Sequence, residues 1–207
     1  MNAGHIDRFF SVLASELDRS ATVMITGAAA GSLLGHVRPS QDIDFSIRLV
    51  RGHGHDWPTV EAAVARTVKL TSIQANYAED IDRWGMISLL DYTRHTRPYK
   101  RFGKLTVRVL DPAYWAIGKL TRYLRPDIRD LVAVLKAQRV PHEQAVRIWG
   151  RALRASPRSA VCELFRRHVE AFLRQNGRKI WGKGFDADAA VNAFHRAAGI
   201  VRQAAKV

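Results

Sequence analysis

The chain has 207 residues, of which 47% are hydrophobic and 25% are charged, a composition typical of a globular protein that buries a substantial core. No stretch approaches the ~20 consecutive apolar residues of a membrane span, and the N-terminus lacks the basic start and apolar run of a signal peptide. We therefore expect a cytoplasmic protein with no membrane segment. The single cysteine, Cys162, excludes an intramolecular disulfide and a zinc cluster made of cysteines.

The formal net charge of +14 is unevenly distributed along the chain. Residues 1–91 carry 8 Lys or Arg against 11 Asp or Glu, whereas residues 92–183 carry 22 against 6. A basic half of this kind is typical of a surface that binds a polyanion, most often the phosphate backbone of a nucleic acid. The same charge also fits a set of solvated helix faces on which arginine aids solubility, and the sequence leaves both interpretations open.

The first elements of the chain are expected to be a helix, a strand and a second helix. Residues 6–17 carry apolar side chains at helical spacing, which predicts an amphipathic helix. Val23–Ile25 is a short apolar run that ends before Gly27, and the small-residue segment Ala28–Leu34 follows with helical propensity. The pattern predicts a strand that enters a helix through a glycine turn.

Polar and apolar residues then alternate strictly in the segment 42–48, Asp-Ile-Asp-Phe-Ser-Ile-Arg. This period of two predicts a strand with Asp42 and Asp44 on one face and the apolar side chains on the other. Two carboxylates at this spacing repel each other unless a positive charge lies between them. Mg²⁺ prefers oxygen ligands and is usually held by one or two carboxylates together with substrate phosphates. The spacing therefore predicts a metal site at Asp42 and Asp44.

The segment 22–48 resembles the nucleotidyltransferase superfamily of the DNA polymerase β type, because a glycine turn follows a strand and Asp-x-Asp lies on the next strand. The phrase RPSQDIDF resembles the R-x-[ST]-x-D-[IV]-D pattern of small bacterial members related to the AbiEii toxin group, and the matching residues are Arg38, Ser40, Asp42 and Asp44. The resemblance implies that Arg38 and Ser40 contact a nucleotide. In the alternative interpretation, Asp42 caps a loop and Asp44 is a solvated strand residue.

The glycine turn is where the resemblance implies binding of the nucleotide phosphates. The backbone amides of Gly27 and Ala28, at the start of the expected helix, would bind the triphosphate. The family usually has Gly-Gly or Gly-Ser at this turn, whereas this chain has Gly27-Ala28. The Cβ of alanine leaves less room for phosphate, so the departure predicts weak or altered nucleotide binding.

Further core elements are expected before the helical C-terminal part. Pro58 begins a helix, and Trp84–Tyr92 and Leu105–Leu110 are interpreted as strands. The expected fold is α/β (α+β), a nucleotidyltransferase-fold mixed sheet of about four strands with flanking helices, followed by a C-terminal helical region. The resemblance implies a third catalytic carboxylate on a neighbouring strand, and Asp91 is the acidic residue that the two later strands offer. Its alternative role is to cap the loop that follows.

Asp111-Pro112 predicts the start of a helix, and the phrase from Leu110 to Lys136 resembles the sequence downstream of the catalytic strands in the AbiEii-like group. In that group a helix that bears a lysine precedes a phrase similar to R-D-x-x-D-L, and Lys119 is the matching position. The resemblance implies that Lys119 neutralises nucleotide phosphate, and a surface lysine is the alternative. Asp127 and Asp130 begin the next helix, where negative charge favours the helix dipole.

We expect residues 1–111 to form the nucleotidyltransferase core and residues 112–207 to form a helical region packed on it. The densest basic patch of this region includes Trp181 and is a candidate RNA-binding surface with one aromatic residue for stacking. The basic members of the patch are Arg166, Arg167, Arg174, Arg178, Lys179 and Lys183.

Together these features predict a nucleotidyltransferase that depends on Mg²⁺ or Mn²⁺ and moves a nucleoside monophosphate from a nucleoside triphosphate to an acceptor hydroxyl. The acceptor is expected to be tRNA or another RNA, and the resemblance implies the toxin of a toxin–antitoxin pair with a small antitoxin protein as partner. Two alternatives stay open. One is a module that binds RNA or a partner protein without catalysis, and the other is an enzyme that modifies a small molecule or a protein.

Overall fold

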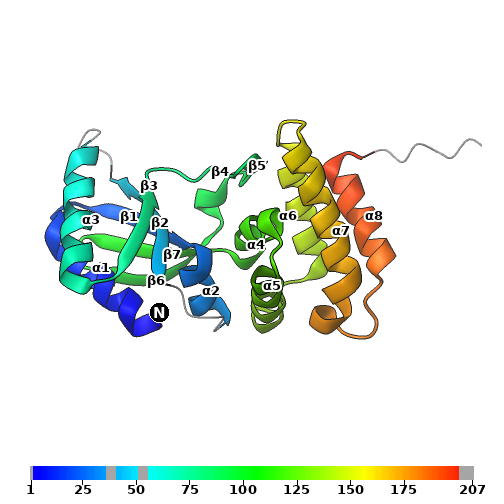
Figure 1. Ribbon diagram of the computed structural model, residues 1–207, viewed down its shortest axis with the longest axis horizontal. Helices are drawn as coiled ribbons and strands as arrows, with labels where there is room; N and C mark the ends of the chain where they lie inside the picture. The colour runs from blue at the N-terminus through cyan, green and yellow to red at the C-terminus, as the bar shows by residue number, and fades with distance from the viewer. Residues whose placement is uncertain (1, 36–40, 51–55, 201–207) are drawn as a thin grey trace, which may run out of the picture. The chain divides into compact units, whose positions relative to one another are not determined.

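The computed structural model describes residues 2–35, 41–50 and 56–200 (Figure 1). The predicted α/β class is confirmed: within these ranges, eight α-helices accompany a mixed sheet of five strands and a separate pair of short strands. The chain divides into two compact units. The first comprises Met1–Ile81 and Thr93–Asp111, and the second comprises Asp82–Tyr92 and Pro112–Val207.

Five strands form the sheet at the centre of the first unit. They are β1 (Ala21–Thr26), β2 (Asp42–Leu49), β3 (Gln74–Ala78), β6 (Thr96–Phe102) and β7 (Leu105–Leu110). The strand order is β3-β2-β1-β7-β6, with β1 antiparallel to β2 and parallel to β7. β2 is parallel to β3, and β6 is antiparallel to β7. The strand that carries Asp-x-Asp therefore lies between β1 and β3.

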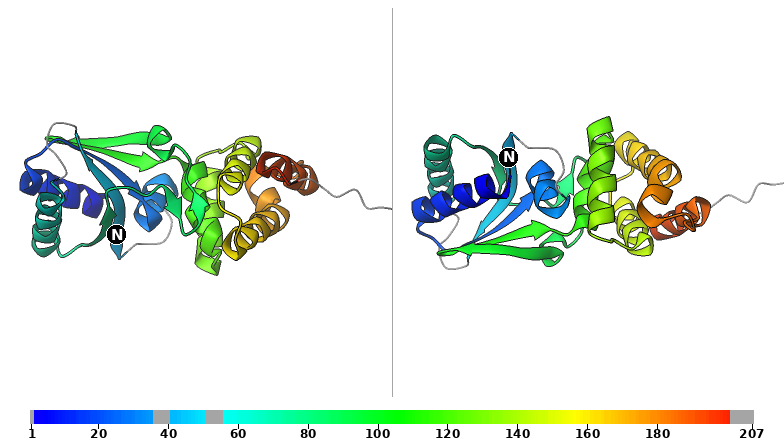
Figure 2. Two further views of the ribbon diagram at one scale, coloured as in Figure 1. Left: turned by 90° about the horizontal axis from the view of Figure 1, so that it is seen from above. Right: turned by 90° about the horizontal axis from the view of Figure 1, so that it is seen from below.

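Two helices, α1 (Ala3–Leu17) and α3 (Trp57–Thr71), lie together against one face of this sheet (Figure 2). The side chain of Asn2 accepts a hydrogen bond from the backbone N–H of His5, which caps the start of α1. The short helix α2 (Gly27–Gly35) continues directly from the end of β1. The predicted order of helix, strand, glycine turn and helix is thus confirmed.

Aromatic packing decides which face of β2 is apolar. The rings of Phe9 and Phe10 on α1 pack edge-on against the ring of Phe45 on β2, at centroid distances of 5.9 and 5.5 Å. All three rings are fully buried. Because alternate residues of a strand face opposite sides, this core leaves Asp42 and Asp44 on the other face of β2.

Five helices make up most of the second unit. They are α4 (Pro112–Arg122), α5 (Arg125–Ala137), α6 (His142–Arg154), α7 (Ala160–Trp181) and α8 (Ala187–Ala198). Every residue of α4 from Pro112 to Leu120 is buried. Helices α6 and α8 approach closely, because Gly150 has no side chain: an added Cβ would lie 2.5 Å from the Cβ of Ala197. None of the helices in the described ranges is long and apolar enough to cross a membrane.

The prediction of one strand over Trp84–Tyr92 is wrong. Gly85 adopts a φ of +56° in a turn, so the segment folds back on itself as two short antiparallel strands, β4 (Arg83–Trp84) and β5 (Ile87–Ser88). This pair belongs to the second unit, where the Trp84 ring packs on Gly118 of α4. The division of the chain at Asp111 and Pro112 lies at the expected start of the helical region.

The sheet has five strands, whereas about four were expected. The two strands that the sequence patterns did not indicate are β3 and β6. Both are edge strands, and most of their side chains are exposed or part-buried. Edge strands bury fewer side chains and often carry charged residues, so their sequences lack the apolar runs that reveal a central strand. The prediction that helices follow the sheet to the C-terminal side is confirmed.

Candidate functional site

The two acidic residues of the Asp-x-Asp pattern lie at the start of β2, on the face opposite the aromatic core. The register pairs Asp44 with Thr26 of β1 on one side and with Asn76 of β3 on the other. Residues paired across strands point to the same face, so Thr26, Asp44 and Asn76 form a row across three strands. Asp42 and Asp44 are both part-buried. The prediction that they share a strand face is confirmed.

Asn76 joins the two carboxylates. Its side-chain Nδ2 donates hydrogen bonds to Oδ2 of Asp42 at 2.8 Å and to Oδ1 of Asp44 at 3.1 Å. Two carboxylate oxygens therefore converge on one donor, whose partial positive charge offsets their mutual repulsion. A hard divalent cation meets the same need more strongly, and the amide oxygen of an asparagine is also a ligand that such cations accept. Asp42 and Asp44 are the residues here that could hold Mg²⁺ or Mn²⁺; Asn76 turns its amide N–H toward them, so its oxygen would join the ligands only after the amide rotates.

Gly27 brings the start of α2 into contact with Asp44. It is the first residue of the helix and has a φ of +59°, in the left-handed region that favours glycine. A Cβ at this position would lie 1.9 Å from Oδ2 of Asp44, so another residue fits only if the carboxylate moves. The N-terminus of a helix carries partial positive charge, which favours bound phosphate. A carboxylate pair and a helix N-terminus thus meet at one place.

The structure places one of the other three residues of the predicted nucleotide site, Ala28, but not Arg38 and Ser40. Ala28 is the second residue of α2, directly after Gly27. Arg38 and Ser40, which the resemblance assigns to nucleotide contacts, lie outside the described residues. Their roles stay predictions.

Asp91 does not lie on a strand, contrary to the expectation. It occupies an exposed bend directly before the short 3-10 helix η1 (Tyr92–Arg94), because the turn at Gly85 ends the extended segment early. It belongs to the second unit, whereas Asp42 and Asp44 belong to the first. Within the described ranges, no group of three or more His, Cys, Asp or Glu side chains is arranged to hold a metal ion. The role of Asp91 as a third carboxylate stays a prediction.

Lys119 is buried inside the second unit, in a different setting from the one that the resemblance implies. Its side chain is 3% exposed, and its Nζ donates to Oδ1 of Asp127 at 3.1 Å and to Oδ2 of Asp130 at 2.7 Å. The ring of Trp115 lies 5.5 Å from the same ammonium group, within reach of a cation–π contact. Two carboxylates therefore already neutralise the charge that the resemblance assigns to a nucleotide phosphate.

The same contacts change the interpretation of Asp127 and Asp130. Carboxylates that only complement a helix dipole lie at the surface, whereas these two side chains are 1% and 4% exposed. Asp127 also accepts a hydrogen bond from Nη2 of Arg122 at 2.9 Å. Lys119, Asp127 and Asp130 form a buried charged cluster that joins α4 to α5, and the charge of each side chain is neutralised by the others.

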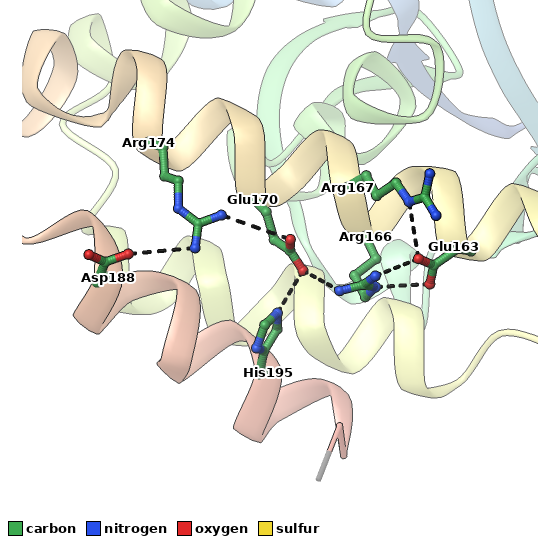
Figure 3. A network of polar contacts seen from close by, with 7 residues as sticks. All are labelled: Glu163, Arg166, Arg167, Glu170, Arg174, Asp188 and His195. Atoms are coloured by element: carbon green, nitrogen blue, oxygen red, sulfur yellow. Dashed lines mark hydrogen bonds and ion pairs between the residues drawn. The ribbon is translucent and has the colours of Figure 1, made fainter. Parts of the chain in front are cut away.

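Three members of the predicted RNA-binding patch, all on α7, form ion pairs within the protein (Figure 3). Arg166 lies between two carboxylates: it is paired with Glu163 and donates to Oε1 of Glu170 at 2.7 Å. Arg167 donates to Glu163 at 3.2 Å. Hydrogen bonds from Arg166 hold the pKa of Glu163 at about 2, below its ordinary value, and the hydrogen bond to Glu163 raises the pKa of the Arg166 guanidinium.

Glu170 is the centre of this network and connects α7 to α8. Its Oε1 lies 2.7 Å from Nε2 of His195, and its Oε2 lies 4.0 Å from Nη1 of Arg174 (Figure 3). Nη2 of Arg174 also lies 3.5 Å from Oδ1 of Asp188. Three of the six predicted RNA-binding residues therefore have acidic neighbours, which lowers the positive potential of this face. The other three members are exposed: Arg178, Lys179 and Lys183.

Trp181, expected to stack on a base, has contacts within the second unit. Its indole N–H donates to the backbone carbonyl of Val140 at 2.8 Å. Its ring also packs on Phe185 at a centroid distance of 4.9 Å and on His142 at 5.9 Å. These contacts account for its position without RNA.

Asn76 is the site residue that sequence reasoning missed. The segment 74–77 alternates polar and apolar residues, so a weak signal for a strand exists, but a segment this short and of low hydrophobicity is not enough to decide it. The alternation of the sequence predicted β2. The pairing of β3 with β2 has no such local signal, because it depends on α3 returning the chain to lie beside β2.

Comparisons with known proteins leave the family open. No protein-family model matches the chain, no curated protein matches it, and no solved structure matches it.

Proposed function

We propose that the first unit binds a divalent cation together with the phosphates of a nucleoside triphosphate and transfers the nucleoside monophosphate to an acceptor hydroxyl. The observation that carries the proposal is the convergence of Asp42 and Asp44 on a single donor beside the N-terminus of α2. Carboxylates of this kind hold hard cations, and helix N-termini hold phosphates. Nucleotidyl transfer is a reaction that needs both at one place.

Each residue has a distinct role in this proposal. Asp42 and Asp44 would hold Mg²⁺ or Mn²⁺, which when bound neutralises charge on the transferred phosphoryl group and on the leaving pyrophosphate. Gly27 and Ala28 would direct backbone amides at the phosphates. In the reaction the acceptor oxygen forms a bond to the α-phosphorus while the bond to the bridging oxygen breaks and pyrophosphate leaves. The resemblance alone assigns to Asp91, a residue of the second unit, the proton of the acceptor hydroxyl, and this role stays a prediction.

A second candidate function, binding without turnover, is favoured by one observation. Within the described residues, the neutral amide of Asn76 touches both carboxylates, and an amide cannot accept a proton from an attacking hydroxyl as a carboxylate can. The same cation and nucleotide would then be held without transfer.

A labelling experiment separates the two candidates. The full chain is incubated with each labelled nucleoside triphosphate, Mg²⁺ or Mn²⁺, and total RNA. The transferase predicts a discrete labelled RNA, and replacing both carboxylates, Asp42→Asn with Asp44→Asn, should reduce labelling on the order of 100-fold or more. The matched control is Asp18→Asn, an exposed carboxylate of the same unit in a left-handed backbone conformation that asparagine tolerates, and it should label normally.

Other outcomes decide among the remaining proposals. Label on protein or on an added small molecule instead of RNA would identify a different acceptor. Binding of Mn²⁺ with nucleotide but no label on any acceptor would establish the second candidate, and Asn76→Asp then tests whether a third carboxylate at β3 restores transfer. Absence of both binding and labelling refutes both candidates. The proposed role as a toxin with a small antitoxin partner predicts growth arrest on expression that depends on Asp42 and Asp44.

A further inference from the structure

A groove at one end of the second unit has no part in the proposed nucleotidyl transfer. It has a volume of about 690 Å³ and lies where the end of α6, the loop before α7, the start of α7 and the end of α8 meet. Figure 1 shows these segments together, with the α6–α7 connection in yellow and the end of α8 in red. A volume of this size lies within the range of about 300–1,000 Å³ that holds small organic ligands.

The charged side chains that line the groove are three arginines and one glutamate. Arg166 and Glu163 form a pair, so the net positive charge comes from Arg154 and Arg158. Both are exposed, and neither guanidinium makes a hydrogen bond or an ion pair with any residue in the ranges that the structure describes. Guanidinium groups bind phosphate and carboxylate oxygens through paired N–H donors. The groove therefore carries two guanidinium groups that can bind an anion.

Arg166 also lines this wall, and its guanidinium is held between Glu163 and Glu170 (Figure 3). These two carboxylates offset its charge, so the attraction for an anion comes from Arg154 and Arg158. The groove also opens at the N-terminus of α7, a helix of 22 residues whose positive dipole end favours negative charge. Ser159 caps that end, because its hydroxyl accepts a hydrogen bond from the N–H of Cys162 at 3.2 Å.

Some of the other residues that line the groove are apolar. Leu153, Pro157 and Ile200 present apolar surface, and the buried thiol of Cys162 lies among them. A simple inorganic anion would leave this surface in water, whereas a ligand with both an anionic group and a flat apolar part would cover it. A nucleotide has both parts, a phosphate and a base.

We propose that this groove is a second ligand site, which takes a nucleotide with its phosphate on Arg154 and Arg158 and its base against the apolar wall. The site is built only from residues of the second unit, so it is independent of the carboxylates in the first. Because its ligands are guanidiniums, binding needs no divalent cation.

The test measures nucleotide binding without metal. Equilibrium dialysis of the full chain against labelled ATP in EDTA should show binding that Asp42→Asn with Asp44→Asn leaves unchanged within about 2-fold. Arg154→Gln with Arg158→Gln should weaken binding by at least about 10-fold, since two charge-assisted contacts are lost. The matched control is Arg147→Gln with Arg151→Gln, which removes the same charge from exposed positions of α6 outside the groove and should change affinity by less than about 3-fold.

Three results would overturn the proposal. They are no metal-free binding by the wild type, loss of binding in the Asp42 and Asp44 variant, and equal losses in the two arginine pairs. A parallel arm uses a short single-stranded RNA: binding of RNA but not ATP, weakened equally by both pairs, identifies a general polyanion surface instead of a nucleotide site. Urea denaturation of each variant confirms that these exposed substitutions leave the fold intact.

Discussion

Replacing Gly27 by alanine tests the central geometry of the site. The glycine has a φ of +59°, and a Cβ there would lie 1.9 Å from Oδ2 of Asp44. Ordinary contacts between such atoms are about 3.5 Å, so the carboxylate must withdraw by more than about 1 Å. Asp44 would then lose its hydrogen bond from Asn76, which is 3.1 Å long.

The expected cost has two parts. The left-handed backbone costs a non-glycine residue about 1–2 kcal/mol. Loss of a hydrogen bond to a charged group costs about 1.5–3 kcal/mol in general, and about 1 kcal/mol here because Asn76 is exposed to water. We therefore expect Gly27→Ala to lower the free energy of unfolding by about 2–3 kcal/mol. It should also weaken Mn²⁺ binding, because the two carboxylates no longer converge.

Gly103 is a matched control for the backbone term alone. It lies in the same unit with a φ of +52°, and nothing lies within 4 Å of its added Cβ. Urea denaturation of Gly27→Ala and Gly103→Ala should differ by about 1 kcal/mol, the contribution of the Asp44 contact. Calorimetric titration with Mn²⁺ should show reduced affinity only for Gly27→Ala. Equal stabilities together with unchanged Mn²⁺ binding would refute the placement of Asp44 against Gly27.

Two further predictions concern charges in the second unit. Lys119→Met should destabilise the protein by about 3–5 kcal/mol in urea denaturation, because it leaves Asp127 and Asp130 buried without their cation; a loss below about 1 kcal/mol would contradict the buried pairing. The lowered pKa of Glu163 predicts stability that is present above its ordinary pKa of 4.5 and is lost as pH falls toward about 2. Thermal melts therefore should show a smaller loss of stability between pH 6 and pH 3 for Glu163→Gln than for the wild type. The two losses should differ by less than about 1 kcal/mol, because the pair with Arg166 is at the surface. An identical pH dependence of the two proteins would refute the pairing.

Local patterns determined the part of the site that lies within one short stretch. The alternation in 42–48 was enough to place Asp42 and Asp44 on one strand face, because the direction of a side chain on a strand follows from its position alone. Gly27 was recognisable for a similar reason, since a glycine between a strand and a helix marks a turn with unusual backbone angles. Some pairs on α7 also follow from spacing, as Glu163 lies three and four residues before Arg166 and Arg167.

Tertiary structure decided which residues meet across the chain. Asn76 reaches Asp42 and Asp44 only because β3 returns to the edge of β2 more than thirty residues later, and no local pattern encodes that pairing. The burial of Lys119 likewise depends on the packing of α4 against α5, since a helical lysine has the same sequence appearance whether solvent or two carboxylates surround it. Burial and neutralisation of a charge are properties of the whole fold, because they depend on every surface that excludes water from the group.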